Sequence, residues 1–246
     1  MIEIRGLCKK FGKKEILRGV DLDIRQGVTT VIFGLSGSGK STIIKHIVGL
    51  LQPDAGEIRV DGQKITGLNG NELLELRKKI GFLFQSGALF DSMNVYENVA
   101  FPLREHTNMS EAEIQKEVYA ALEMVALEPE RVSKLYPDEL SGGMRKRAGL
   151  ARTIILRPQI MLYDEPTTGL DPIISDQISQ MIIKLQKELK ITSILISHDI
   201  KEAFKCADYA AMLYEGVIIE SSDADSFKNT DNKIVQNFLN GRQIEA

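Results

Sequence analysis

Short runs of consecutive apolar residues, separated by stretches with helical spacing, dominate the hydrophobic pattern of this chain. Val28 to Phe33, Ile160 to Tyr163 and Thr192 to Ser197 have the character of strands buried on both faces of a parallel sheet. Thr42 to Leu51 and Pro172 to Lys190 carry apolar residues at helical spacing, and each follows one of these strands or a turn after it. Alternating strands and helices in this order predict an α/β fold.

The remaining apolar runs predict further strands at both ends of the core. They are expected at Ile2 to Arg5, Val20 to Ile24, Glu57 to Val60, Ile80 to Gln85, Tyr209 to Tyr214 and Val217 to Glu220. Gly6 to Gly19 is interpreted as a connecting or hairpin region, and Asn71 to Lys79 as a helix. Asp61-Gly62 favours a tight hairpin turn. The first strands therefore predict a small antiparallel β subdomain.

Residues 86–157 have a different pattern, which is mostly helical. Ser110 and Glu113 form a capping box that starts a helix ending near Val125, and Ser141 to Ile155 predicts a second long helix. We therefore expect one cassette over 1–246, with a catalytic core at about 1–85 and 158–222 and a helical subdomain inserted between. A tail at about 223–246 contains one more helix, whose apolar stripe is expected to pack on its own domain or to contact a second subunit. The stripe is Ile234, Val235, Phe238 and Leu239.

Composition narrows the class of protein without identifying it. The 246 residues are 43% hydrophobic, enough for a sizeable core, and no run approaches the length of a membrane span. A net charge of −3 gives no general attraction to nucleic acid or anionic lipid, so no nucleic-acid partner is expected. Cys8 and Cys206 have no metal-ligand or redox spacing, which suits small core residues in a reducing compartment.

The strongest chemical signal matches the pattern G-x-x-x-x-G-K-[ST] between a predicted strand and a predicted helix. The stretch is Gly34-Leu35-Ser36-Gly37-Ser38-Gly39-Lys40-Ser41-Thr42. Glycines allow backbone N–H groups to converge on phosphates, and the helix N-terminus favours anions. Lys40 is expected to reach the β- and γ-phosphates, and the Ser41 hydroxyl to ligate Mg²⁺. The sequence therefore predicts a nucleoside triphosphate site. A flexible glycine turn is the alternative interpretation.

Four further polar residues follow predicted strands and belong at the same sheet edge. Asp164 suits a partner of Mg²⁺, and Glu165 suits the general base for the attacking water. Gln85 is a candidate to ligate Mg²⁺ and orient water, and His198 a candidate to bond a γ-phosphate. Each of these residues alone has an ordinary alternative as a solvated strand end.

Leu140-Ser141-Gly142-Gly143-Met144 places a serine and two glycines at the start of a long helix, which predicts a second anion site. Arg145-Lys146-Arg147 just beyond is interpreted as a solvated helix face, with help to phosphate charge as the alternative. With this stretch, the chain resembles the ATP-binding cassette (ABC) ATPase family along essentially its whole length. The resemblance implies a P-loop NTPase ABC ATPase fold: a RecA-like core, an N-terminal antiparallel β subdomain and an inserted helical subdomain.

The same resemblance implies a functional homodimer, because in ABC proteins each ATP lies between the phosphate loop of one cassette and the Leu140 to Gly143 stretch of another. By this likeness Phe11 stacks on adenine, Asp171 belongs to the loop that crosses the dimer interface, and His198 is the switch histidine. Phe11 stands where tyrosine is commoner and keeps the ring face. Met144 replaces the usual glutamine, so no polar ribose contact is expected there.

Within the family, residues 86–106 and 135–145 look most like the ATPase subunit of Mla-type, MCE-associated phospholipid transporters. That likeness implies a separate integral-membrane permease, an MCE-domain lipid-binding protein and attachment to the cytoplasmic face of the inner membrane. In some members a small STAS-domain protein also binds the helical subdomain. Ala88, Leu89 and Phe90 are expected to meet the permease or to pack inside the subdomain. The alternatives are subunits for small-solute import, lipoprotein release or cell-division signalling, and a non-transport ATPase that scaffolds assembly.

Overall fold

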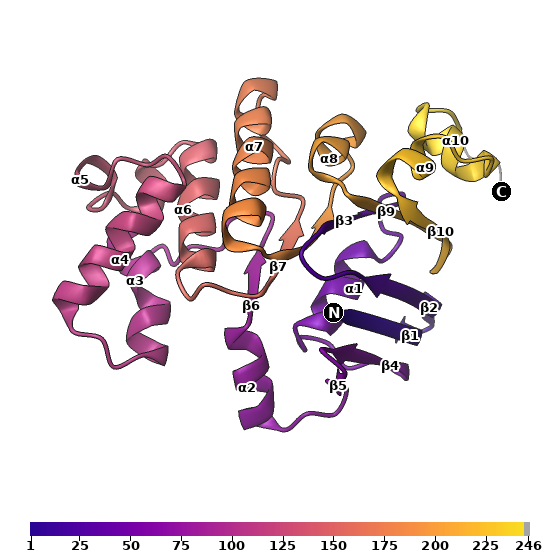
Figure 1. Ribbon diagram of the computed structural model, residues 1–246, viewed down its shortest axis with the longest axis horizontal. Coiled ribbons are helices and arrows are strands. Elements are labelled where there is room, and N and C mark those ends of the chain that lie inside the picture. Colours follow the sequence, from indigo (N-terminus) through magenta and orange to yellow (C-terminus); the bar gives the residue numbers. More distant parts are fainter. Residues whose placement is uncertain (244–246) are drawn as a thin grey trace.

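The computed structural model describes residues 1–243, and its helices and strands form a catalytic core with a helical insertion at one end (Figure 1). Residues 244–246, included in the predicted cassette and tail, lie outside the described part. The strands are β1 Ile2–Phe11, β2 Lys14–Ile24, β3 Thr29–Phe33, β4 Ala55–Val60, β5 Gln63–Lys64, β6 Ile80–Leu83, β7 Ile160–Asp164, β8 Thr192–Ile196, β9 Tyr209–Tyr214 and β10 Val217–Asp223. The helices are α1 Lys40–Ile47, α2 Gly70–Lys78, α3 Val95–His106, α4 Glu111–Met124, α5 Pro129–Val132, the 3₁₀ turn Pro137–Glu139, α6 Gly142–Ile154, α7 Pro172–Leu189, α8 Ile200–Cys206, α9 Ala224–Lys228 and α10 Lys233–Leu239.

Two sheets build the core. The larger has the order β10-β9-β3-β8-β7-β6 and is parallel except for β10, whereas the smaller is antiparallel with the order β2-β1-β4-β5. Strand β8 lies between β3 and β7, so the phosphate loop and the Asp164 strand end are one strand apart at the same edge. This α/β arrangement is the predicted one.

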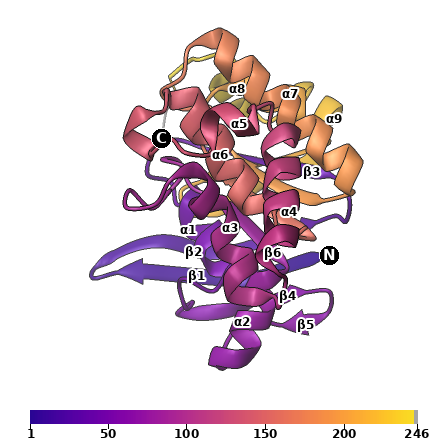
Figure 2. The same cartoon turned by 90° about the vertical axis from the view of Figure 1, so that its left-hand side faces the viewer.

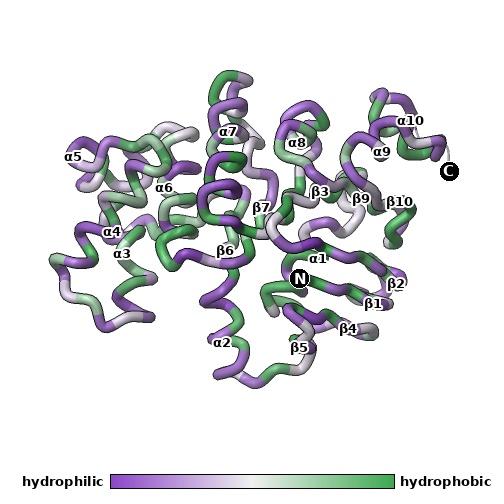
Figure 3. Tube along the Cα trace, in the orientation of Figure 1, coloured by the Kyte–Doolittle hydropathy of each residue, from purple (hydrophilic) through white to green (hydrophobic). Residues whose placement is uncertain are grey.

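The parallel strands of the larger sheet are buried on both faces, and their residues alternate between two apolar cores. In β7, Ile160 and Leu162 join the core shared with the smaller sheet and α1, whereas Met161 and Tyr163 join the core under the other helices. Along α7, hydrophobic and hydrophilic residues alternate around the helix (Figure 3), and its buried positions face that second core. These strands carry continuous apolar runs because helices or strands cover both faces of the sheet.

The helical insertion packs as a group, with α3, α4 and α6 side by side in both views (Figures 1 and 2). Asn94 and Ser110 cap α3 and α4 through reciprocal boxes with Glu97 and Glu113, as the sequence predicts for Ser110. Over residues 1–243, no helix is both long enough and apolar enough to cross a bilayer.

Several predicted boundaries are wrong. The helix after the phosphate loop spans Lys40–Ile47 instead of Thr42 to Leu51, because Gly49 turns the chain with a φ of 68°. Strand β6 ends at Leu83 instead of Gln85, since its ladder with β7 ends there. Strands β1 and β2 extend beyond their predicted bounds, and of the two interpretations of Gly6 to Gly19 the hairpin is confirmed, with a turn at Gly12 and Phe11 paired to Lys14.

The tail packs on its own domain. Phe227 of α9 and Val235 of α10 are fully buried, and the Phe238 ring lies 5.9 Å from the ring of Phe33. The packing interpretation of the apolar stripe is thus confirmed for these side chains.

Candidate functional site

The phosphate loop lines a cavity of about 310 Å³ at the carboxyl end of β3. Its lining is Phe11, Ile16, Ser36, Gly37, Gly39, Lys40, Ser41, Thr42 and Glu165. Gly39 has a φ of 107°, and a Cβ there would lie 2.8 Å from a side-chain carbon of Ile16. Only glycine therefore allows the loop to lie against the end of the β1–β2 hairpin, which brings Phe11 to the cavity.

Lys40 is already directed into the loop. Its side chain is only 6% exposed, and Nζ donates to the carbonyls of Gly34, at 2.8 Å, and Leu35, at 2.9 Å. Burial lowers the pKa of this amine, and the charges of Glu165 and Asp164 act against that effect. A cation held by carbonyls beside an open cavity is suited to bind phosphate oxygens.

Helix α1 differs from the other long helices at its N-terminus. Gly39 precedes it and supplies no side-chain cap, whereas Asn69, Asn94, Ser110, Ser141 and Asp171 each accept a backbone N–H at the start of their helices. The first N–H groups of a helix have no partner within the helix. In α1 they are left for an anion in the cavity, and the helix dipole favours the same charge.

The structure brings Ser41 and Asp164 together. Ser41 Oγ donates to Asp164 Oδ1 at 2.8 Å, and burial raises the pKa of this carboxyl group while the Ser41 hydrogen bond lowers it. Hydroxyl and carboxylate oxygens are the ligands that Mg²⁺ prefers, so the pair fits that ion. Within residues 1–243 no three Asp, Glu, His or Cys side chains cluster as a metal site.

Glu165 lies directly after β7 with its carboxylate held by two side chains. His198 Nδ1 lies 3.2 Å from Oε1, and the Thr168 hydroxyl donates to Oε2 at 3.2 Å. The register of β7 and β8 pairs Asp164 with Ile196, which places the residues after both strands side by side. Thr168 was not among the predicted site residues; a hydroxyl three positions after the carboxylate was the available signal.

The other predicted residues occupy different places around this cavity. Phe11 is 49% exposed at its rim, with Lys9 Nζ 5.8 Å from the ring centre. Gln85 and His198 are not part of the cavity lining. Gln85 follows β6 with an exposed side chain, and its backbone carbonyl accepts a hydrogen bond from Lys146.

The predicted second anion site is at the start of α6. Ser141 and Gly142 are exposed, Leu140 is buried, and Ser141 Oγ accepts from Met144 N at 3.3 Å. Gly143 lets α6 approach α7, because a Cβ there would lie 2.7 Å from Ile174 Cγ2. A cavity of about 390 Å³ beside Ser141 shares no lining residue with the phosphate-loop cavity. The chain thus holds two separate candidate anion sites.

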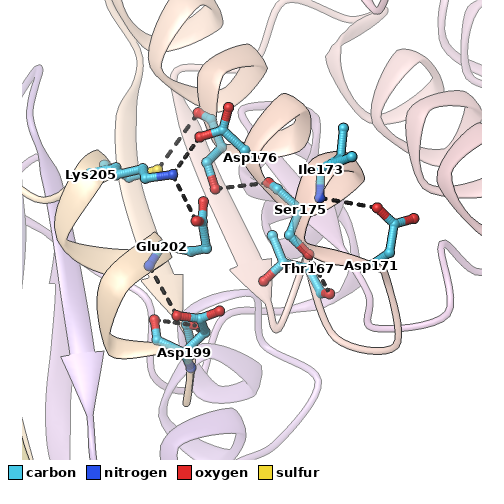
Figure 4. Close-up of polar contacts among 11 residues, drawn as sticks. Thr167, Asp171, Ile173, Ser175, Asp176, Asp199, Glu202 and Lys205 are labelled. Carbon is cyan, nitrogen blue, oxygen red and sulfur yellow. Dashed lines mark hydrogen bonds and ion pairs between the residues drawn. The ribbon is translucent and has the colours of Figure 1, made fainter.

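Asp171 stands at the start of α7, where Oδ1 accepts from Ile173 N at 3.0 Å (Figure 4). Lys205 joins this helix to α8: its Nζ pairs with Asp176 of α7 and with Glu202 of α8, the latter at 2.7 Å. Because α8 begins shortly after His198, the ion pair between Lys205 and Asp176 fixes the start of α7, beside Asp171, relative to the loop that carries the histidine.

The interpretation of Arg145-Lys146-Arg147 as a solvated helix face is wrong. Arg145 and Arg147 donate to the carbonyls of Pro137 and Ala126, and Lys146 is only 6% exposed. The three basic side chains donate hydrogen bonds to carbonyl groups of the same chain. The hydrophobic periodicity and the charge of the sequence do not reveal these contacts.

Comparison with known proteins agrees with this geometry. The family model described as ABC transporter matches residues 17–168. The probable ribonucleotide transport ATP-binding protein mkl of Mycobacterium leprae is 44% identical over 99% of this chain and 70% of its own length. The intermembrane phospholipid transport system ATP-binding protein MlaF of Haemophilus influenzae is 44% identical over 98% of this chain and 90% of its length. MlaF of Escherichia coli strain K12 is 39% identical.

Solved structures give the same answer for the fold. A dimeric ATP-binding cassette in a post-hydrolysis state with ADP and Pi superposes with a TM-score of 0.84 at 34% identity, covering 91% of this chain and 99% of that one. The cbiO1 protein of Clostridium perfringens, part of an ABC transporter complex, has the same TM-score at 30% identity, covering 97% and 94%. This chain therefore belongs to the ABC transporter family, as one of its ATP-hydrolysing cassette subunits.

Proposed function

We propose that this chain is the ATPase subunit of a transporter that moves phospholipid between the inner and outer membranes of a diderm bacterium. One observation supports the ATPase part: the uncapped N–H groups at the start of α1, the Lys40 amine and the Glu165 carboxylate all lie at one cavity. The phospholipid part is supported by the similarity to the Haemophilus protein over nearly the full length of both chains. The mycobacterial relative is equally identical but is named for ribonucleotides, and this chain spans a smaller share of it.

ATP would bind with its adenine against the Phe11 ring and its phosphates on the loop from Gly34 to Thr42. Lys40 would exchange its carbonyl partners for the β- and γ-phosphate oxygens. Ser41, Asp164 and Gln85 would hold Mg²⁺, which when bound neutralises charge that develops on the phosphates.

Glu165 would act as the general base. Its carboxylate takes a proton from the attacking water, whose oxygen bonds to the γ-phosphorus as the bond to the β–γ bridging oxygen breaks, giving ADP and inorganic phosphate. His198 and Thr168 support this role, because their contacts with the two carboxylate oxygens fix the direction of the group. His198 would then also bond the γ-phosphate.

Two copies of the chain would complete each site. Leu140, Ser141, Gly142, Gly143 and Asp171 of one copy would face the ATP held by the phosphate loop of the other. The separation of the two cavities supports this arrangement, since one chain offers two halves that share no lining residue.

A substitution at Ser141 tests the shared site. Ser141→Arg places a bulky side chain at an exposed helix start, so ATP-driven dimerisation of a Glu165→Gln chain should be lost while each monomer still binds ATP. Size-exclusion chromatography with and without ATP measures dimer formation. If the Ser141→Arg chain forms dimers at the same ATP concentrations as the chain without it, the shared site is contradicted. Ser110→Arg, at an exposed helix cap away from the cavities, is the matched control.

The permease would dock on the helical subdomain near Phe90. Its ring is 43% exposed, and Tyr136 on the same subdomain is 44% exposed. Fully buried Asn98 fixes the loop from Phe90 to Met93, accepting from Phe90 N at 2.7 Å and donating to Met93 O at 2.9 Å. An ordered loop with an exposed aromatic ring is suited to receive a partner helix. Attachment to a permease would place the chain on the cytoplasmic face of the inner membrane.

An MCE-domain lipid-binding protein and a small STAS-domain regulator are the further partners that this function requires or permits. Purification of the tagged chain from detergent-solubilised membranes of its own bacterium tests them together. We expect a permease and an MCE-domain protein in the complex, and ATP hydrolysis that phospholipid stimulates. A complex with a permease that responds to ribonucleotides or another small solute, and lacks MCE protein, would overturn the lipid assignment.

A further inference from the structure

Helix α6 is attached along one face to the segment that follows β6. Gly149 lies against this segment so closely that a Cβ would come 2.9 Å from Gly87 O. One turn later, Arg152 Nη2 donates to Ala88 O at 2.7 Å, and its guanidinium carbon lies 5.4 Å from the centre of the Phe90 ring. Because these contacts involve mainly backbone groups, the segment and the helix are expected to move as one body.

Lys146 stands on the same face of α6, three residues before Gly149, and reaches beyond the helical insertion. Its Nζ donates to the carbonyl of Gln85, at the start of the attached segment, and to the carbonyl of Glu165 at 3.3 Å. Glu165 belongs to the catalytic core, directly after β7. One buried cation therefore connects the insertion with the backbone of the proposed base.

The backbone of Glu165 needs such support. Its φ of 52° lies in the left-handed region, which a residue with a side chain occupies only when its surroundings hold it there. Its N–H donates to Ile196 O at 3.0 Å, so β8 fixes one side of the residue. On the other side the carbonyl accepts from Thr168 N, within its own turn, and from Lys146 Nζ, each at 3.3 Å, and Lys146 is the donor that comes from the helical insertion.

We propose that Lys146 is a positioning residue for ATP hydrolysis, which aligns Glu165 according to the position of the helical insertion. Movement of α6 relative to β7 changes the Lys146 bond to the Glu165 carbonyl, while the bond to Gln85 moves with the helix. The orientation of the base thus follows the orientation of the insertion. This inference rests on the proposed role of Glu165 as the general base.

Three substitutions in the full-length chain test it: Lys146→Met, Lys146→Gln and Lys146→Arg. Lys146→Met should lower kcat by about 10- to 100-fold, as expected for a misplaced catalytic group, while the Kd for ATP stays within about twofold. Lys146→Arg keeps a cationic donor and should have a higher kcat than Lys146→Met. Lys116→Met, an exposed lysine on α4 of the same insertion, is the matched control and should leave kcat unchanged.

Several outcomes would overturn the inference. They are an unchanged kcat in Lys146→Met, a loss that appears as weaker ATP binding at normal kcat, and an Arg variant no better than the Met variant. If Lys146→Met does not fold, Lys146→Gln, whose amide is uncharged and shorter in reach than the lysine side chain, replaces it in the same comparison.

Single turnovers with Glu165→Gln separate this inference from the role of the base. If Glu165→Gln alone keeps normal turnover, the assignment of the base fails. If Glu165→Gln is inactive and Lys146→Met is normal, only the positioning role fails. Adding Lys146→Met to Glu165→Gln should cause no further loss, because the lysine acts through the carboxylate, whereas an additive loss would contradict that path.

Discussion

His198 Nδ1 lies 3.2 Å from Glu165 Oε1, although the two residues follow different strands. The contact results from the parallel pairing of β7 with β8, in which Asp164 is opposite Ile196. Glu165 lines the phosphate-loop cavity, and His198, outside that lining, contacts its carboxylate.

Glu165→Gln should abolish most turnover and preserve ATP binding, because glutamine keeps the shape of the side chain and loses its proton-accepting power. We expect kcat to fall by about 10²- to 10⁴-fold, the usual contribution of a general base. Phosphate release and equilibrium binding of a fluorescent ATP analogue measure the two effects. Glu123→Gln, an exposed carboxylate on α4, should behave as the unchanged chain; normal turnover in Glu165→Gln would remove Glu165 from the role of base.

Lys40→Ala should weaken ATP binding by about 10- to 100-fold, the range for loss of a charge-assisted hydrogen bond. The affinity for adenosine should change little, because Lys40 belongs to the phosphate loop, whereas Phe11, the proposed adenine contact, belongs to the β1–β2 hairpin. Isothermal titration calorimetry with both ligands separates the two contributions. Equal losses for ATP and adenosine would indicate a damaged loop instead of a missing phosphate contact.

Gly149→Ala should destabilise the chain, because the added Cβ would lie 2.9 Å from Gly87 O and 3.0 Å from Gly87 Cα. Overpacking of this kind costs about 1–3 kcal/mol. Gly70→Ala is the control, since Gly70 begins α2 and nothing lies within 4 Å of its added Cβ. Urea unfolding of both variants gives the free energies of unfolding, and equal stabilities would contradict the close approach of α6 to the attached segment.

Cys206 should react slowly with alkylating reagents in the folded chain. Burial raises the pKa of its thiol to about 12, so at pH 8 only about 10⁻⁴ of it is thiolate. A raised pKa favours the protonated form, and the reaction rate should therefore increase about tenfold for each pH unit below that pKa while the chain stays folded. In a Cys8→Ser variant, mass spectrometry should find alkylation about 10³-fold faster in urea than in buffer; similar rates would contradict the burial.

The sequence alone determined the features that depend on neighbours along the chain. The glycines of the phosphate loop, the cap at Ser110 and the acidic pair Asp164-Glu165 after an apolar run are local patterns. Their physical requirements, such as positive φ, helix capping and burial of a strand, are met within a few residues. For that reason the α/β fold class and the nucleotide loop could be predicted without knowledge of the contacts.

The tertiary structure decided which of these features meet. The order β3-β8-β7 and its register bring Ser41 to Asp164 and His198 to Glu165. The sequence pattern of α6 predicts solvent contact for Lys146, yet the approach of Gly149 to Gly87 buries it against two carbonyl groups. Long-range packing sets such contacts, since hydrophobic period and charge describe a helix face but not the backbone that lies against it.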